Sequence, residues 1–115
     1  TKGEEARLKV LRYVSEHPEA STRQIADAIG VSNGQGYYLV KALIDKGFVK
    51  LSNFTKAEKK SQYLYLLTAS GVGEKLRLTE KFLEIKRTEY RLLRSEIEAL
   101  SADLDDAALI RRTLD

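Results

Sequence analysis

Two adjacent capping boxes constrain the fold of this chain more than any other feature. Ser21 is followed three residues later by Gln24, and Ser32 is followed in the same way by Gln35. In such a box each side chain can satisfy a backbone donor that the first turn of a helix leaves open. Gly30 stands between the two boxes and can supply the left-handed turn that ends a helix. The spacing therefore predicts two short helices joined by a tight turn.

A further helix is expected before the two boxes. Apolar residues recur at a mostly helical spacing over 4–16, and Pro18 stops the continuation of that helix. The helix after Ser32 closes at Gly47. Its apolar face is expected to consist of Tyr38, Leu39, Ala42, Leu43 and Ile44.

A hairpin is expected next. The segments 48–52 and 63–67 are rich in β-branched and aromatic residues and alternate in polarity, which is typical of strands. The connection over 53–61 is longer than a tight turn and rich in lysine. The expected inward positions are Val49, Leu51, Leu64 and Leu66.

A long helix, capped by Thr68 or Ser70, is expected to follow. From Val72 to Leu104 a register of alternating steps of four and three residues carries apolar side chains, with Thr79 and Lys86 as exceptions. We call its members the apolar stripe: Val72, Leu76, Leu83, Tyr90, Leu93, Ile97, Leu100 and Leu104. Residues 105–115 are expected to form a short final helix that folds back or frays.

The apolar stripe admits three explanations: packing on its own domain, a coiled coil with another copy, or a helix that binds a different partner. More than three heptads of apolar residues exceed what a small winged core can cover. Exposing such a stripe in a monomer would favour aggregation. We therefore expect a homodimer.

Composition narrows the functional classes. The 115 residues include no cysteine and one histidine, so thiolate sites are excluded and a histidine metal or catalytic cluster is not expected. No pair of carboxylates stands out as an acid/base couple, and we expect neither an enzyme nor a metal or cofactor. No apolar run approaches the roughly 18 residues of a membrane span. We expect a cytoplasmic protein that does not bind membranes.

The order of the elements is that of a winged helix-turn-helix. Residues 21–49, STRQIADAIGVSNGQGYYLVKALIDKGFV, resemble the core of the MarR family, with a Gly-Val-Ser turn and a recognition helix that ends in Leu-Ile-Asp-Lys-Gly. The stretch YLYLLTASG is similar to the family's return strand and the start of its next helix. Over about residues 5–100 the chain is similar, more narrowly, to MarR-like regulators associated with exopolysaccharide biosynthesis clusters.

The fold class expected from the elements and the resemblance is mainly α with a small β-hairpin. A winged helix-turn-helix DNA-binding domain over 1–70 would be followed by a long helical dimerisation region over 71–115. The resemblance also implies an unidentified small-molecule effector, because MarR-like proteins often bind small phenolic or other ligands.

The recognition helix carries the candidate base-reading residues. A helix fits the major groove with its N-terminal residues toward the base edges. Gln35 is the first candidate because Asn and Gln can pair bidentately with adenine. Tyr37 can contact a phosphate or a thymine methyl group, and Lys41 can neutralise a phosphate or read guanine. Outside the wing the predicted DNA-binding residues are Ser21, Thr22, Arg23, Ser32, Asn33, Gln35, Tyr37, Tyr38 and Lys41. Of these, we interpret Tyr38 mainly as a packing residue.

The wing is expected to supply affinity. The net charge of +3 is small, but residues 41–60 hold six lysines and two acidic side chains, so the positive charge is local. We predict that Lys56, Lys59 and Lys60 attract DNA independently of its sequence by releasing counterions. A solvated run of charges is the alternative interpretation.

Gly34 and Gly36 are unusual in a recognition helix, because each glycine costs up to about 1 kcal/mol relative to alanine in a helix interior. One interpretation is close approach of the backbone to DNA, with a tip that orders on binding. The other is tight packing against the preceding helix or a tolerated defect.

The expected function is a homodimeric transcription regulator, chiefly a repressor, that reads a palindromic operator in double-stranded DNA. Exopolysaccharide genes are the expected target from the resemblance. The alternative is a winged-helix module that binds another protein and no specific DNA.

Overall fold

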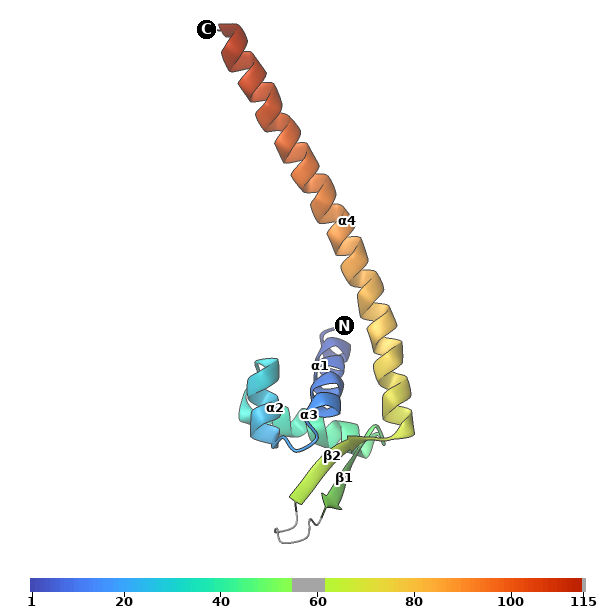
Figure 1. Cartoon of the computed structure of the whole chain (residues 1–115). Coiled ribbons are helices and arrows are strands. Elements are labelled where there is room, and N and C mark those ends of the chain that lie inside the picture. The colour runs from blue at the N-terminus through green and yellow to red at the C-terminus, as the bar shows by residue number, and fades with distance from the viewer. Residues whose placement is uncertain (55–61, 115) are drawn as a thin grey trace. The chain divides into compact units, whose positions relative to one another are not determined.

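Three helices and a two-stranded hairpin precede one long helix in the computed structural model, which describes residues 1–54 and 62–114 (Figure 1). The elements are α1 (Lys2–Glu16), α2 (Thr22–Ile29), α3 (Asn33–Asp45), β1 (Val49–Phe54), β2 (Gln62–Leu67) and α4 (Ala69–Leu114). The expected fold class, mainly α with a small hairpin and a long C-terminal helix, is confirmed.

The chain divides into two compact units, Thr1–Glu80 and Lys81–Asp115. The first unit includes the start of α4, because Gly71, Glu74 and Leu78 are buried there. Leu78 is fully buried, so it belongs to the core of the first unit. The predicted division of functions between residues 1–70 and 71–115 stays a prediction.

The core of the first unit joins the three short helices, β1 and the start of α4. Its buried apolar side chains come from all three short helices, from β1 and from α4. Leu11, Val14 and Ile25 are essentially inaccessible to solvent. The buried apolar residues are Leu8, Val10, Leu11, Val14, Ala20, Ile25, Ala26, Val40, Leu43, Val49 and Leu78.

The hairpin is antiparallel and pairs Val49 with Leu67 and Leu51 with Tyr65. The backbone N–H of Tyr65 also donates to the carbonyl of Pro18 at 2.9 Å, which ties β2 to the loop between α1 and α2. Val49 is buried as expected, but the inward prediction for Leu51 is wrong, since Leu51 is 51% exposed. Leu51 lies two residues beyond Val49 on β1, and at that position the strand extends past the edge of the core. Leu64 and Leu66 are half-buried.

The junction between the hairpin and α4 is tightly packed. The hydroxyl of Thr68 accepts a hydrogen bond from the backbone N–H of Gly71 at 3.0 Å and donates to the carbonyl of Gly47. Thr68 is therefore the residue that caps α4. A Cβ atom at position 71 would overlap the carbonyl of Phe48, whereas one at Gly73 would meet open space. Only glycine at position 71 lets α4 begin so close to β1.

A network of ion pairs fastens α4 to α1. Glu74, which is only 9% exposed, accepts hydrogen bonds from Arg7 at 2.5 Å and from Arg77 at 2.6 Å. Arg77 also pairs with Glu4 at 3.1 Å. The hydrogen bond from Arg77, reinforced by Arg7, holds the pKa of Glu74 below its ordinary value against the opposing effect of burial. The carboxylate is therefore ionised and fully paired.

In the second unit α4 continues without a break to Leu114. The expected short final helix over 105–115 is wrong. No glycine or proline interrupts the chain after Gly73, so nothing in the backbone forces a second helix to start. Among the described residues no helix is long and apolar enough to cross a membrane. The same residues contain no group of three or more acidic or histidine side chains that could hold a metal ion.

Replacing Glu74 with glutamine should lower the free energy of unfolding by about 1–3 kcal/mol at pH 7, because two arginines lose a charged partner at a buried site. The pKa of Glu74 is depressed in the folded state, so its contribution is complete above the ordinary glutamate value of about 4.3 and is lost as the pH falls below it. Urea denaturation at pH 7 and pH 3 measures the effect. Glu16→Gln, at an exposed site on α1, is the control. A difference between Glu74→Gln and the original chain that stays the same at both pH values would refute the linkage.

Candidate nucleic-acid interface

The helix-turn-helix is built by the two capping boxes. The hydroxyl of Ser21 accepts from the backbone N–H of Gln24 at 3.1 Å, and the Gln24 side chain accepts from the Ser21 N–H at 2.9 Å. Ser32 and Gln35 form the same arrangement at the start of α3. Gly30 adopts the left-handed conformation, with φ of 79°, between the helices. The predicted capping boxes and the predicted turn are confirmed. Together these features fix the direction in which α3 leaves α2.

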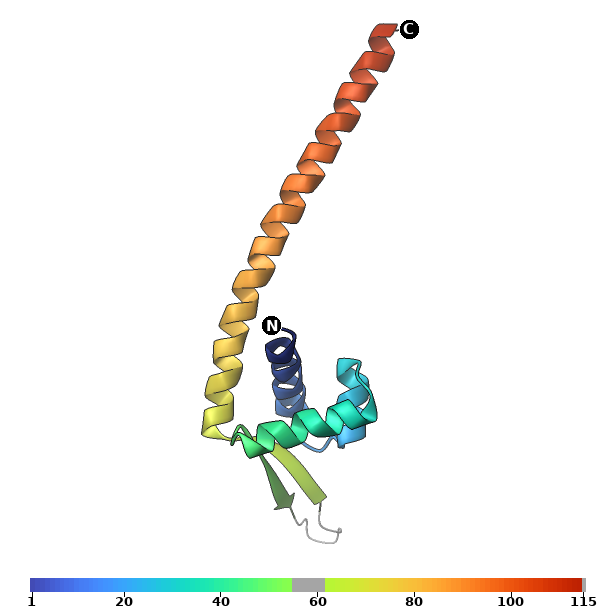
Figure 2. The ribbon, with the colours of Figure 1, turned by 180° about the vertical axis from the view of Figure 1, so that it is seen from behind.

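One face of α3 is exposed. Figure 2 shows α3 along its whole length, with α1 and α2 behind it. Gly36, Val40 and Leu43 bury the opposite face. Asn33, Tyr37 and Lys41 are all exposed and follow one another at steps of four residues, so they lie in one line along the helix. An amide, a phenol and an ammonium group are thus presented side by side, the groups that contact base edges and phosphates.

Gln35 has a second role that bears on its expected base reading. Its side-chain oxygen accepts from the backbone N–H of Ser32 at 3.4 Å. Bidentate pairing with adenine needs both the oxygen and the nitrogen of the amide. Such a contact would compete with the capping bond for the amide oxygen, while Asn33 can present its whole amide to DNA. Base reading by Gln35 stays a prediction.

Tyr38 does not pack in the core. It is 71% exposed, and its ring meets the edge of the Tyr37 ring with centroids 6.0 Å apart. The expectation that Tyr38 is mainly a packing residue is wrong, because Leu39 and Val40 already turn the apolar side of the helix inward. The two tyrosines form an exposed aromatic pair beside Lys41.

The two glycines of α3 have different explanations. Gly36 is buried, and a Cβ atom there would lie 2.5 Å from the Cβ of Ala26 and 3.2 Å from the carbonyl oxygen of Thr22. Close packing against α2 therefore explains Gly36. Gly34 is exposed, and an added Cβ atom would meet nothing within 4 Å. Packing does not explain Gly34, and close approach of DNA remains the functional interpretation.

The first turn of α2, the end of α3 and the start of β1 add polar and basic groups. Ser21 and Arg23 are exposed and Thr22 is half-buried. Lys46 and Lys50 are exposed as well, although the sequence interpretation did not single them out as binding residues. The sequence feature that could have identified Lys46 and Lys50 is the cluster of lysines over 41–60. The predicted wing residues Lys56, Lys59 and Lys60 lie outside the described residues.

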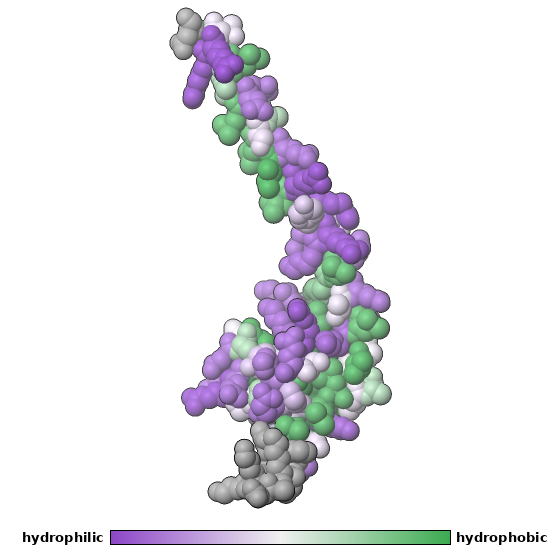
Figure 3. Space-filling view, viewed as in Figure 1, coloured by the Kyte–Doolittle hydropathy of each residue, from purple (hydrophilic) through white to green (hydrophobic). Residues whose placement is uncertain are grey.

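The apolar stripe of α4 is exposed throughout. In the first unit Val72 and Leu76 are 58% and 60% exposed. They lie on a different side of the helix from the buried Gly71, Glu74 and Leu78. In the second unit the exposed members are Leu83, Tyr90, Leu93, Ile97, Leu100 and Leu104. Figure 3 shows hydrophobic side chains along one side of this helix and hydrophilic ones along the other. Within each unit taken by itself, the side chains of the stripe are therefore not covered.

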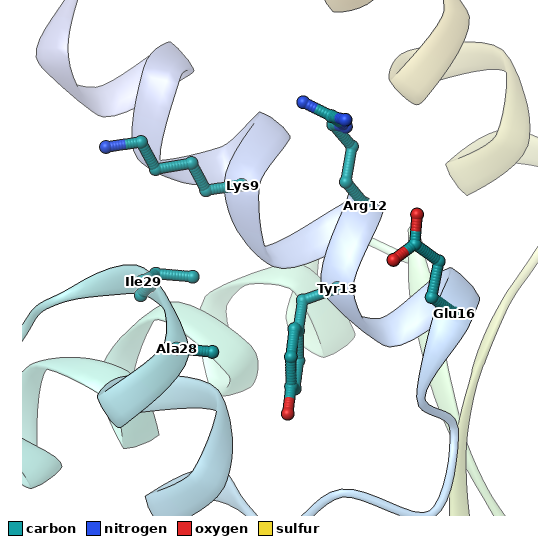
Figure 4. Close-up of a pocket in the computed structure, with 6 residues that line it drawn as sticks. All are labelled: Lys9, Arg12, Tyr13, Glu16, Ala28 and Ile29. Carbon is teal, nitrogen blue, oxygen red and sulfur yellow. The ribbon is translucent and has the colours of Figure 1, made fainter.

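A shallow hollow opens between α1 and α2 (Figure 4). Tyr13 projects from α1 toward α2, where Ala28 and Ile29 form the other wall. Lys9, Arg12 and the carboxylate of Glu16 also line the hollow, and the Arg12 side chain points away from α2. The volume of the hollow, about 290 Å³, is at the lower end of the range for small-molecule sites.

Comparison with known proteins agrees with this geometry. Residues 4–50 match a family model described as winged helix-turn-helix DNA-binding. The comparison by sequence with curated proteins gave no match. The described elements and the matched model together define a winged helix-turn-helix.

Solved structures share the fold. The PcaV transcriptional regulator of Streptomyces coelicolor, in complex with its natural ligand, has a TM-score of 0.63 and 21% identity, covering 95% of this chain and 72% of that one. A MarR family protein of Mycobacterium tuberculosis, in complex with p-aminosalicylic acid, has a TM-score of 0.55 and 20% identity, covering 84% and 77%. A PadR-like transcriptional regulator of Bacillus cereus has a TM-score of 0.64 and 14% identity, covering 76% and 89%. At these identities the likeness shows the fold.

Replacing Gly36 with alanine should lower the free energy of unfolding by about 2 kcal/mol, because the new methyl group would push α3 away from Ala26. Gly34→Ala is the matched control in the same helix. It should be neutral or stabilise the fold by up to about 1 kcal/mol, since alanine is the better helix former. Urea denaturation of the two variants measures the difference. Equal effects of the two substitutions would contradict the packing explanation for Gly36.

Proposed function

We propose that this chain is a DNA-binding transcription regulator of the MarR type, which inserts α3 into the major groove. The observation that supports the proposal best is the exposed line of Asn33, Tyr37 and Lys41 on a helix whose start is fixed by a complete capping box. No acidic side chain lies within residues 33–41 to repel phosphates. Arg23, exposed at the start of α2, is positioned for a backbone contact.

The regulator acts as a homodimer in this proposal, with the apolar stripe of α4 as the contact between copies. The exposed leucines and isoleucine of the stripe would be an aggregation hazard in a monomer, and a second copy is the occupant that covers them most simply. A two-fold dimer presents two recognition helices, so the operator would be a palindrome with half-sites about one helical turn apart. Binding there would repress transcription by excluding polymerase.

The target genes follow from the sequence resemblance alone. That resemblance points to exopolysaccharide biosynthesis genes, while the family model and the solved structures carry no such link. Mapping the operator in the genome of origin tests this part of the proposal. An operator that lies beside unrelated genes would refute the assignment and leave DNA binding intact.

A small aromatic acid is the effector class we propose. The Mycobacterium tuberculosis protein of the same fold is in complex with p-aminosalicylic acid. The hollow between α1 and α2 is lined by Lys9, Arg12 and the ring of Tyr13, together with the carboxylate of Glu16. Adding p-aminosalicylate to a DNA titration, with Arg12→Ala as the comparison variant, tests whether the acid changes affinity through this hollow.

The regulator function is tested by a fluorescence titration against fragments of the genome of origin at 0.15 M salt. A promoter fragment should bind at least about 1,000-fold more tightly than random DNA, as is usual for specific regulators. Equal binding to all fragments would overturn the proposal. A protein-interaction module would bind no DNA fragment above background.

Replacing Lys41 with alanine should weaken DNA binding and lower the slope of log affinity against log salt by about one, if the ammonium neutralises one phosphate. If Lys41 reads guanine, the substitution should instead relax the sequence preference at one base pair. Lys2→Ala, on the first turn of α1, is the control and should leave affinity, slope and preference unchanged. If the Lys41→Ala variant leaves the affinity, the salt slope and the sequence preference unchanged, α3 does not lie at the interface with DNA.

A further inference from the structure

Two charged columns flank the apolar stripe in the second unit. In heptad terms the a positions hold Leu83, Tyr90, Ile97 and Leu104, and the d positions hold Lys86, Leu93 and Leu100. The residue before each of the last three a positions is acidic, at the g sites Glu89, Glu96 and Asp103. The residue after each of the first two d positions is basic, at the e sites Arg87 and Arg94. All five charged side chains are exposed.

This division of charge distinguishes the two ways in which the helix can pair with a second copy. In an antiparallel pair the g column faces the g column and the e column faces the e column, so carboxylates would meet carboxylates and arginines would meet arginines. In a parallel, in-register pair each g residue faces the e residue five positions later in the other chain. Glu89 then faces Arg94 of the second copy, and this contact forms twice in the dimer.

We propose that residues 83–104 pair with a second copy as a parallel, in-register, two-stranded coiled coil. The inference rests on the homodimer of the proposed function and adds the direction of the chains. The opposite charges of Glu89 at g and Arg94 at e favour this occupant over an unrelated partner, while the other acidic g residues, Glu96 and Asp103, face the uncharged Ser101 and Ala108. At one level of the helix, Ile97 at an a position between Leu93 and Leu100 at d positions is the combination that favours two strands, whereas the other a positions hold leucine or tyrosine.

Lys86 is the polar exception in the stripe, and its contacts agree with this pairing. Its ammonium group lies 3.1 Å from the carboxylate of Glu89, one turn farther along the same helix. The charge is thus drawn from the d position toward the flank of the helix. In the parallel pair the two Lys86 head groups, which stand at the same level, are each held beside their own Glu89. Glu89 would then lie between Lys86 of its own chain and Arg94 of the other.

Charge reversal tests the predicted contact between Glu89 and Arg94. On one helix residues five apart point about 140° away from each other, so these two cannot contact within a chain. Glu89→Arg and Arg94→Glu should each weaken dimerisation by about tenfold, measured by sedimentation equilibrium. The double variant should return to within about threefold of the original chain. The double variant also lacks the contacts of Glu89 with Lys86 and of Arg94 with Glu98, so recovery cannot come from them. A double variant weakened about 100-fold would overturn the proposal.

Disulfide crosslinking tests the direction directly, because the chain contains no cysteine. Leu83→Cys and Leu104→Cys place single thiols about 31 Å apart along the helix. A parallel pair brings each thiol beside its own copy, so both variants should crosslink in a glutathione redox buffer. Ser95→Cys, on the outer side of the proposed coil, is the control and should remain reduced.

The outcomes separate this inference from the proposed function. In an antiparallel pair at most one level of the helix can meet its own copy. Crosslinking of only one variant, or a crosslink between Leu83→Cys and Leu104→Cys when the two are mixed, would overturn the parallel direction and keep the dimer. A chain that sediments as a monomer and crosslinks at neither position would overturn both the direction and the dimer.

Discussion

The contact between Ala26 and Gly36 determines how the recognition helix is held. Helices usually pack with their axes 8–10 Å apart, and the side chains at the crossing set the distance. Here a methyl group faces a glycine, which lets α3 approach α2 closely and brings the carbonyl of Thr22 within reach of the same point. The capping boxes fix the start of each helix, but this contact sets their separation. The exposed line on α3 and the position of β1 behind it both depend on that separation.

Local rules predicted most of the fold. The boxes at Ser21 and Ser32 and the turn at Gly30 depend on neighbours within a few residues, so the sequence contains all the information for them. The exposed stripe of α4 was also foreseeable, because helical periodicity shows which side chains share a face. The sequence did not reveal which face the core would cover. Leu78, in the same helix as the exposed stripe, is buried, and Leu51, expected inside, is exposed.

The candidate interface was predicted less completely, because its geometry depends on contacts between distant residues. Gly36 could serve packing or DNA, and only the position of Ala26 decides between them. Tyr38 has a large apolar ring, which favours burial on average, yet the core beneath α3 is already filled by Val40 and Leu43. The Glu74 network was not anticipated at all. Its members are spread over α1 and α4, and no spacing in the sequence links them.

The hydrogen bond between Gln35 and Ser32 has a consequence for how a protein of this kind can change its target. A side chain that caps its own helix cannot be exchanged for a new specificity without weakening the helix, because the loss of a cap lowers stability by about 1 kcal/mol. Asn33, Tyr37 and Lys41 form no part of the capping box of α3. Variation at those three positions can change the DNA sequence that α3 recognises while the fold stays intact. Position 35 is different, since there natural selection and protein design must satisfy stability and recognition with the same amide.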